Sequence, residues 1–193
     1  APFKKTKTTS TTPIGTDHPN GQTTSLHNDS FLLTIVSEVP ETDVKLKSSI
    51  REVDAMRSDV SVYQNPTLNG FRERITSARI WWYTGFEDNG MPLFVHEQPH
   101  DEYLHNVPLK QLAVIIADAV KYGKLEVVVL NTSSTLELGT ALSQTANVPL
   151  VVCWDGHVED RAAYMFGTTL AASFKSGKDP IEAFERAKSK VES

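Results

Sequence analysis

The sequence predicts an α/β domain in which a mostly parallel β-sheet carries helices on both faces. Three observations support this class. Strand-like and helix-like runs alternate from residue 31 to residue 190. One run, Leu125 to Asn131, is almost entirely apolar and β-branched, which is typical of a central strand covered on both faces. Two Ser-x-x-Glu capping boxes, Ser49 with Glu52 and Ser134 with Glu137, predict helix starts between strand-like runs.

The first half of the pattern predicts three strands, two helices and a hairpin. The third strand contains Trp81 and Trp82, and alternation along a strand should place one ring on each face of the sheet. The turn signal Asp88-Asn89-Gly90 predicts that Pro92 to His96 forms the returning arm of a hairpin. The predicted strands cover residues 31–37, 60–63 and 79–84, and the helices begin at Ser49 and cover Leu68 to Ile75.

The second half alternates more regularly. A helix begins near Pro108 and ends at Gly123, and the strand Leu125 to Asn131 and the second capping box follow. Leu150 to Trp154 is a fifth strand, and two helices complete the chain, one ending at Gly177 and one beginning at Asp179-Pro180. In such sheets function gathers at the carboxyl ends of the strands, which directs attention to the loops 84–88, 131–135 and 155–160.

Composition limits the possible classes of function. The 193 residues suffice for one sizeable core. The net charge of −5 gives no reason to propose a nucleic-acid partner, and no apolar run approaches the roughly 18 residues that cross a bilayer, so we expect no membrane partner. The single cysteine, Cys153, excludes an internal disulfide, favours a cytoplasmic location and should fill the core.

Residues 1–30 differ in composition from the predicted domain, residues 31–193. They are rich in Thr, Ser, Asn and Pro, and no acidic residue precedes Asp17. Such a segment buries little apolar surface and predicts an extended or flexible arm. The alternative is a trimmed organelle-targeting segment, because those are also Ser-rich and poor in acidic residues.

Four stretches in the correct order resemble the CHAT family, whose caspase-like domains are often attached to helical repeats. Three of them are residues 49–56, 66–83 and 127–131. The fourth resembles the closing signature of the family and contains Trp154, Asp160, Ala162, Phe166, Gly177, Ala183, Phe184 and Ala187. The resemblance implies a caspase-like three-layer sandwich. It also implies a cleft in which a His at the end of strand three activates a Cys at the end of strand four.

Both reactive positions of the family are substituted in this chain. The His position falls on Phe86, after Gly85, and the Cys position falls on Ser133, after Asn131-Thr132. A phenyl ring takes no proton, and a serine hydroxyl is far less acidic than the thiol that the family uses. We therefore expect a catalytically degenerate interaction or regulatory module with a protein partner, no cofactor and helical repeats elsewhere in the full-length protein. The expected cleft residues are Gly85, Phe86, Asn131, Ser133, Ser134, Asp155, His157 and Asp160.

The alternative is an active hydrolase or transferase. His157 follows strand five and should face the same edge as Ser133, so it is a candidate displaced base. Glu137 is a second candidate nucleophile, because residues 133–141 faintly resemble a loop of nucleoside deoxyribosyltransferases. The structural interpretation is simpler: Ser133 and Ser134 cap the following helix, Glu137 is their cap partner, and Asp160 caps or pairs with the start of its own helix. A further possibility for Asp160 is a substrate-pocket acid.

The string His96-Glu97-Gln98-Pro99-His100 matches the H-E-x-x-H motif of zinc peptidases. That motif requires a helix, which places both imidazoles on one face. Pro99 opposes a helix at this point, and the string follows a strand-like run. We therefore expect a surface loop and no metal.

Overall fold

The computed structural model describes residues 3–7, 31–36, 51–52, 55, 61–96 and 104–193. The strands are β1 (Phe3–Lys7), β2 (Phe31–Val36), β3 (Ser61–Gln64), β4 (Ile80–Gly85), β5 (Glu87–Asp88), β6 (Met91–Val95), β7 (Leu104–Asn106), β8 (Val127–Asn131) and β9 (Leu150–Trp154). The helices are α2 (Leu68–Ile75), α3 (Leu109–Tyr122), α4 (Leu136–Gln144), α5 (Asp160–Lys175) and α6 (Pro180–Glu192).

The main sheet has six strands in the order β1-β9-β8-β4-β2-β3. All neighbours are parallel except β1, which runs antiparallel to β9. Counted along the chain, the five parallel strands therefore have the doubly wound order 2-1-3-4-5, with a switch point between β2 and β4. The predicted α/β class with a mostly parallel sheet is confirmed.

The position of β8 agrees with its apolar sequence, because the strand lies between β4 and β9. It begins at Val127, two residues later than predicted. The N–H groups of Leu125 and Glu126 instead donate to the carbonyls of Ala119, at 3.4 Å, and Arg79, at 2.9 Å. These bonds fix the connection from α3 to the start of the strand.

Part of the predicted arm belongs to the main sheet. Residues 3–7 form β1, with Phe3 opposite Trp154 and Lys7 opposite Leu150 of β9. Residues 1–2 and 8–30 of the arm lie outside the described residues. An antiparallel edge strand on an otherwise parallel sheet is a common arrangement.

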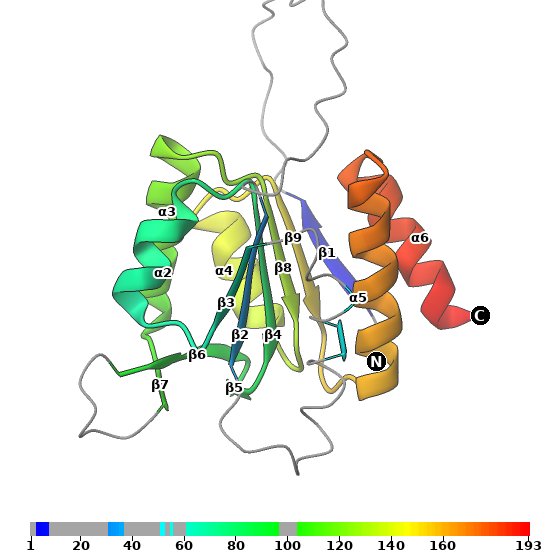
Figure 1. Ribbon diagram of the computed structural model, residues 1–193, viewed down its shortest axis with the longest axis horizontal. Helices are drawn as coiled ribbons and strands as arrows, with labels where there is room; N and C mark the ends of the chain where they lie inside the picture. The colour runs from blue at the N-terminus through cyan, green and yellow to red at the C-terminus, as the bar shows by residue number, and fades with distance from the viewer. Residues whose placement is uncertain (1–2, 8–30, 37–50, 53–54, 56–60, 97–103) are drawn as a thin grey trace, which may run out of the picture.

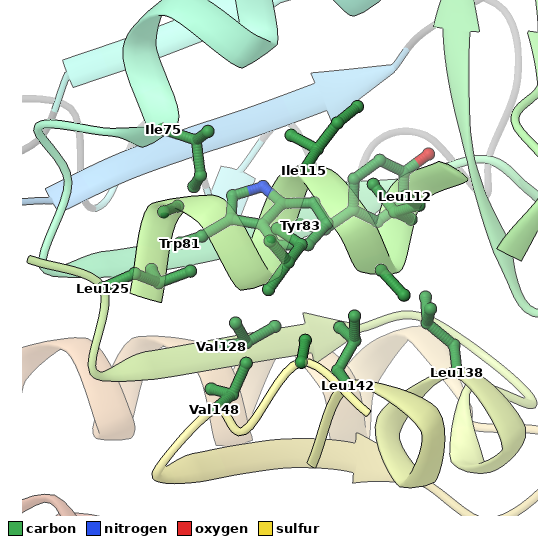
Figure 2. Close-up of a cluster of buried hydrophobic side chains, with 14 of the residues drawn as sticks. Ile75, Trp81, Tyr83, Leu112, Ile115, Leu125, Val128, Leu138, Leu142 and Val148 are labelled. Carbon is green, nitrogen blue, oxygen red and sulfur yellow. The ribbon is translucent and has the colours of Figure 1, made fainter. Parts of the chain in front are cut away.

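Helices cover both faces of the sheet, with α2, α3 and α4 on one side and α5 and α6 on the other (Figure 1). Figure 2 shows the core of the first side, where Trp81 and Val128 pack against residues such as Leu112 of α3 and Leu142 of α4. Trp82 belongs to the core on the second side. The prediction that the two Trp rings enter opposite faces is confirmed, as is the burial of Cys153.

A small antiparallel sheet, β5-β6-β7, adjoins the carboxyl edge of β4. The predicted hairpin is confirmed, because Asp88 pairs with Met91 across a turn in which Asn89 and Gly90 both have positive φ. A Cβ on Gly90 would lie 2.2 Å from the carbonyl oxygen of Ser134, so only glycine permits this approach to the loop after β8.

Two further predictions at the level of elements hold in the structure. Gly123 is the C-cap of α3, and Asp179 is the N-cap of α6, accepting hydrogen bonds from the N–H groups of Ile181 and Glu182.

Within the described parts of the chain, no helix has the length and apolar character to span a membrane.

Candidate functional site

A cleft of about 330 Å³ lies at the carboxyl edge of β4 and β8. The loops after β4, β8 and β9 and the first turn of α5 form its walls. Its lining residues are Glu52, Gly85, Phe86, Glu87, Asn131, Thr132, Ser133, Ser134, His157, Val158, Asp160, Ala163 and Tyr164. All but one of the cleft residues expected from the sequence lie in this set. The exception is Asp155, which follows β9 and is half-buried but does not line the cleft.

The loop after β4 places Phe86 on the wall of the cleft. Gly85 has a φ of 112°, a conformation that suits glycine and turns the chain sharply at the end of the strand. The Tyr83 hydroxyl donates a hydrogen bond to the Phe86 carbonyl and accepts one from the N–H of Leu93 at 3.0 Å. Burial raises the pKa of Tyr83 well above its usual range, so this hydroxyl stays protonated. The phenyl ring of Phe86 is half-buried and lines the cleft.

Ser133 contacts the loop after β9. Its Oγ accepts a hydrogen bond from the N–H of Val158 at 3.1 Å and lies 3.4 Å from Nδ1 of the exposed His157. The N–H of the next residue, Ser134, donates to the carbonyl of Gly156 at 2.8 Å. The loops after β8 and β9 are therefore joined directly, and the structure brings the predicted candidate pair Ser133 and His157 together.

The prediction that Ser133 and Ser134 cap the following helix is wrong. Helix α4 begins at Leu136, and its N-cap is Thr135, whose side chain makes no capping bond. Ser134 has a φ of 57°, in the left-handed region, and this places the helix start after it. The Thr135 hydroxyl instead accepts the N–H of Trp154 at 3.1 Å. Glu137, the predicted cap partner and second candidate nucleophile, is exposed and does not line the cleft.

Two other residues shape the walls of the cleft. The Thr132 hydroxyl donates to the carbonyl of Gly85 at 3.0 Å and so links the loop after β8 to the loop after β4. Asp160 is the first residue of α5, whose N-cap is Glu159, so Asp160 does not cap its helix as predicted. No side chain forms a capping bond at the described start of α5, and Asp160 lines the cleft instead.

Glu52 lies at the floor of the cleft and was not predicted to belong there. The sequence predicts that it caps a helix start at Ser49, which lies outside the described residues, whereas the Glu52 side chain is only 1% exposed. Its Oε1 accepts hydrogen bonds from Trp82 Nε1 at 3.1 Å and Asn131 Nδ2 at 2.8 Å, and its Oε2 lies 3.1 Å from Thr84 Oγ1. Burial raises the pKa of Glu52 to about 8, although the three hydrogen bonds act in the opposite direction.

Asn131 extends this network to the second side of the sheet. Its Oδ1 accepts from Trp154 Nε1 at 2.9 Å, and its Nδ2 also donates to the carbonyl of Ala163 at 3.0 Å. Helix α5 passes so close that a Cβ on Gly167 would lie 2.1 Å from Glu52 Oε1. The described polar atoms of Glu52 and Asn131 are thus fully satisfied, as buried polar groups in folded proteins generally are.

The zinc-peptidase string lies mostly outside the described residues, because the structure describes His96 but not residues 97–100. The His96 ring is 4.0 Å from that of His105 on β7. Desolvation, and then the neighbouring His96, lower the pKa of His105. Within the described ranges, no three His, Cys, Asp or Glu side chains are grouped as metal ligands would be.

Comparison with known proteins adds no family to these observations: no family model matches the sequence, and no curated protein matches it either.

Proposed function

We propose that this chain is a caspase-like three-layer sandwich of the CHAT type whose Cys–His centre has been lost and whose cleft binds a protein partner. The observation that carries the proposal is the location of the two substituted positions. Phe86 follows the third parallel strand in chain order, Ser133 follows the fourth, and both line one cleft. This is the relation that the family's His and Cys require.

The chemistry of the lining residues supports a binding role over a proteolytic one. Phe86 cannot accept a proton from a nucleophile. The thiol of Cys153 is fully buried in the core on the α4 side, so it does not replace the missing nucleophile. Ser133 Oγ already accepts the N–H of Val158, which stabilises the loop rather than activating the hydroxyl.

The size and lining of the cleft suit a short stretch of a partner protein. Its volume of about 330 Å³ lies at the lower end of the range for ligand pockets. Hydroxyl, amide and carboxyl groups from the loops after β4, β8 and β9 surround it. Such a site accommodates a side chain of a partner with several hydrogen bonds, as an interaction or regulatory module requires.

Covalent probes test the loss of chemistry. Wild type and Ser133→Ala are incubated with a fluorophosphonate probe for active serines and an iodoacetamide probe for active thiols, and labelling is followed by mass spectrometry. We expect no labelling of folded wild type by either probe, and no hydrolysis of a tetrapeptide-amide library. Binding is tested by screening the same library for an increase in Tm that Ser133→Trp abolishes and Ser176→Trp, on the exposed end of α5, retains.

The approach of Ser133 Oγ to His157 Nδ1 at 3.4 Å favours a second candidate, an acyl-transfer enzyme with a displaced base. In that case the fluorophosphonate would label Ser133, Ser133→Ala would abolish labelling, and His157→Ala would reduce it by about 10²-fold or more, as expected for loss of a general base. This outcome would replace the proposed binding module with a serine hydrolase.

A further inference from the structure

The Glu52 carboxyl connects, directly or through Asn131, to every element whose end forms a wall of the cleft. It contacts Trp82 and Thr84 on β4 and Asn131 on β8 directly. Through Asn131 it also reaches Trp154 on β9 and Ala163 on α5. These elements are the same ones whose ends form the cleft above the carboxyl.

The hydrogen bonds around this carboxyl can serve a neutral acid, although all three are donated to it and favour the charged form. Oε1 accepts two N–H donors, from Trp82 and Asn131, as a carbonyl oxygen does. Within the described residues, Oε2 accepts a hydrogen bond from the Thr84 hydroxyl at 3.1 Å. A hydroxyl also accepts hydrogen bonds, so a proton on Oε2 can be donated to Thr84 Oγ1 once that hydroxyl has rotated.

The described surroundings of Glu52 supply no positive charge. In the described ranges, the Arg and Lys ion pairs involve Glu126, Glu182 and Glu192, and none involves Glu52. The groups that face the carboxyl are Trp82 and Thr84 from β4, Asn131 from β8 and Gly167 from α5. The ionisable side chains along the cleft wall are Glu87, His157, Asp160 and Tyr164. A pKa of about 8 for Glu52 agrees with burial that no counter-charge offsets.

Glu52 holds its partners at the points where the cleft loops begin. Thr84 immediately precedes Gly85 and Phe86, and Asn131 immediately precedes Thr132 and Ser133. A buried anion without a counter-ion is unstable until water reaches it. Because Glu52 lines the cleft, we expect water to reach the carboxyl from the cleft, between these two loops.

We propose that Glu52 positions the cleft as a neutral carboxylic acid, and that loss of its proton releases the loops after β4 and β8. Glu52 is thereby a positioning residue and the cleft is regulated by pH. The inference concerns the same cleft as the proposed function, and the relevance of the inference to binding rests on that proposed function. Its test uses no ligand and no covalent probe, so failure of one proposal is distinguishable from failure of the other.

Tryptophan fluorescence reports the proton directly, because Trp82 and Trp154 both bond to this network. Wild type should show a transition near pH 8 that Glu52→Gln abolishes, since the amide reproduces the neutral acid. Thr84→Val should move the midpoint upward, because the Thr84 hydroxyl favours the charged form, and Thr84→Ser should restore it. The matched control is Ser173→Ala, which removes a buried hydroxyl that bonds the Thr169 carbonyl and does not line the cleft, and it should leave the midpoint unchanged.

Amide hydrogen exchange locates the response. Wild type and Glu52→Gln are compared at pH 6 and pH 9, so that the intrinsic exchange rates cancel at each pH. At pH 9, residues 84–87 and 131–134 should exchange about tenfold faster in wild type than in Glu52→Gln, because pH 9 lies about one unit above the pKa of Glu52. At pH 6 the two proteins should exchange at equal rates. Equal acceleration of α3 and α6 would show global loosening and overturn the proposal. A fluorescence transition that persists in Glu52→Gln, or that Thr84→Val does not move, would do the same.

Discussion

Glu52 occupies a setting in which its carboxyl is more stable with a proton than without one. The side chain is buried against the indole of Trp82 and against Gly167, and its three hydrogen bonds offset only part of the effect of burial. The ordinary pKa of an unfolded Glu is 4.5, whereas in the folded protein it is about 8. The folded state therefore binds this proton more tightly than the unfolded chain does, and folding stability depends on pH through this one group.

The first prediction concerns that dependence. The stabilising contribution of the proton is complete below pH 4.5 and is lost as the pH rises toward 8. In that window the free energy of unfolding of wild type should fall relative to that of Glu52→Gln by up to about 1.4 kcal/mol per pH unit. Urea unfolding of both proteins at several pH values measures the difference. A difference that stays constant with pH would show that Glu52 is ionised in the folded protein.

The second prediction concerns the glycine that packs on this carboxyl. A methyl group at residue 167 would lie 2.1 Å from Glu52 Oε1 and 2.9 Å from Asn131 Nδ2. Both atoms belong to a buried hydrogen-bond network, so moving either of them away from the methyl group would break bonds in that network. Gly167→Ala should therefore lower the free energy of unfolding by about 1–3 kcal/mol, measured by urea unfolding at pH 6. The control is Ala172→Ser on the exposed face of α5, expected to change stability by less than about 0.5 kcal/mol.

For single residues, the sequence predicts where a side chain lies better than it predicts what that side chain does. It places Phe86, Ser133 and His157 near one another because they follow three parallel strands. It assigns Glu52 to a helix cap because Ser49 precedes it by three residues. One feature of the sequence indicates burial instead of a cap: Glu52 lies four residues before Met56, on the predicted apolar face of that helix. The partners of a buried acid come from distant strands, and a local pattern does not contain them.

At the scale of elements, helix α6 and helix α4 differ in how they begin. Asp179 caps α6, with its Oδ1 accepting the N–H of Ile181 at 2.9 Å. The sequence predicts a similar cap at Ser134 for α4, but the structure starts that helix at Leu136. The approach of Gly90 and the bond to Gly156 hold Ser134 in its left-handed conformation. Tertiary contacts thus override the local sequence pattern that predicts a cap at Ser134.

The third prediction separates these two helix starts. Asp179→Ala should cost about 1 kcal/mol of stability, with a range of about 0.5–2 kcal/mol, because two N–H groups lose their acceptor. Ser134→Ala should change stability by less than about 0.5 kcal/mol, because its side chain does not cap α4. Both variants are measured by thermal unfolding at pH 7. A loss on Ser134→Ala as large as that on Asp179→Ala would contradict the capping geometry described for α4.

The strands follow their sequence patterns wherever burial determines them. The run Leu150 to Trp154 is a strand with the predicted bounds, and the Trp81-Trp82 pair alternates as expected. Strand β1 was not predicted because its sequence, Phe-Lys-Lys-Thr-Lys, has no apolar alternation. It lies at the sheet edge, where backbone pairing with β9 suffices and Lys side chains are tolerated.

At the scale of the whole molecule, the doubly wound sheet brings the ends of β4, β8 and β9 to one edge. The strand order places β8 between the other two, and the loop contacts Thr132–Gly85 and Ser133–Val158 connect all three. The sequence predicted this edge from strand–helix alternation alone. It did not predict the cleft floor, because the segment that carries Glu52 is separated from Asn131 by 79 residues along the chain.

The fourth prediction concerns the cleft as a whole. Phe86→His combined with Ser133→Cys supplies the two side chains that a caspase-type centre uses. The new pair must act as a unit, and neither half is useful alone. Here the backbone at residue 86 is held by Tyr83, and the side chain at residue 133 is engaged by Val158, so neither group is free to adjust toward the other.

We therefore expect the double variant to lose stability without gaining turnover. Replacing the half-buried phenyl ring removes apolar contact worth about 1 kcal/mol, which lowers Tm by about 2–4 °C in a domain of this size. The measurements are thermal melts and hydrolysis of the tetrapeptide-amide library by wild type, both single variants and the double variant. Turnover in the double variant alone would contradict this expectation: the loops would then already hold residues 86 and 133 at catalytic distance.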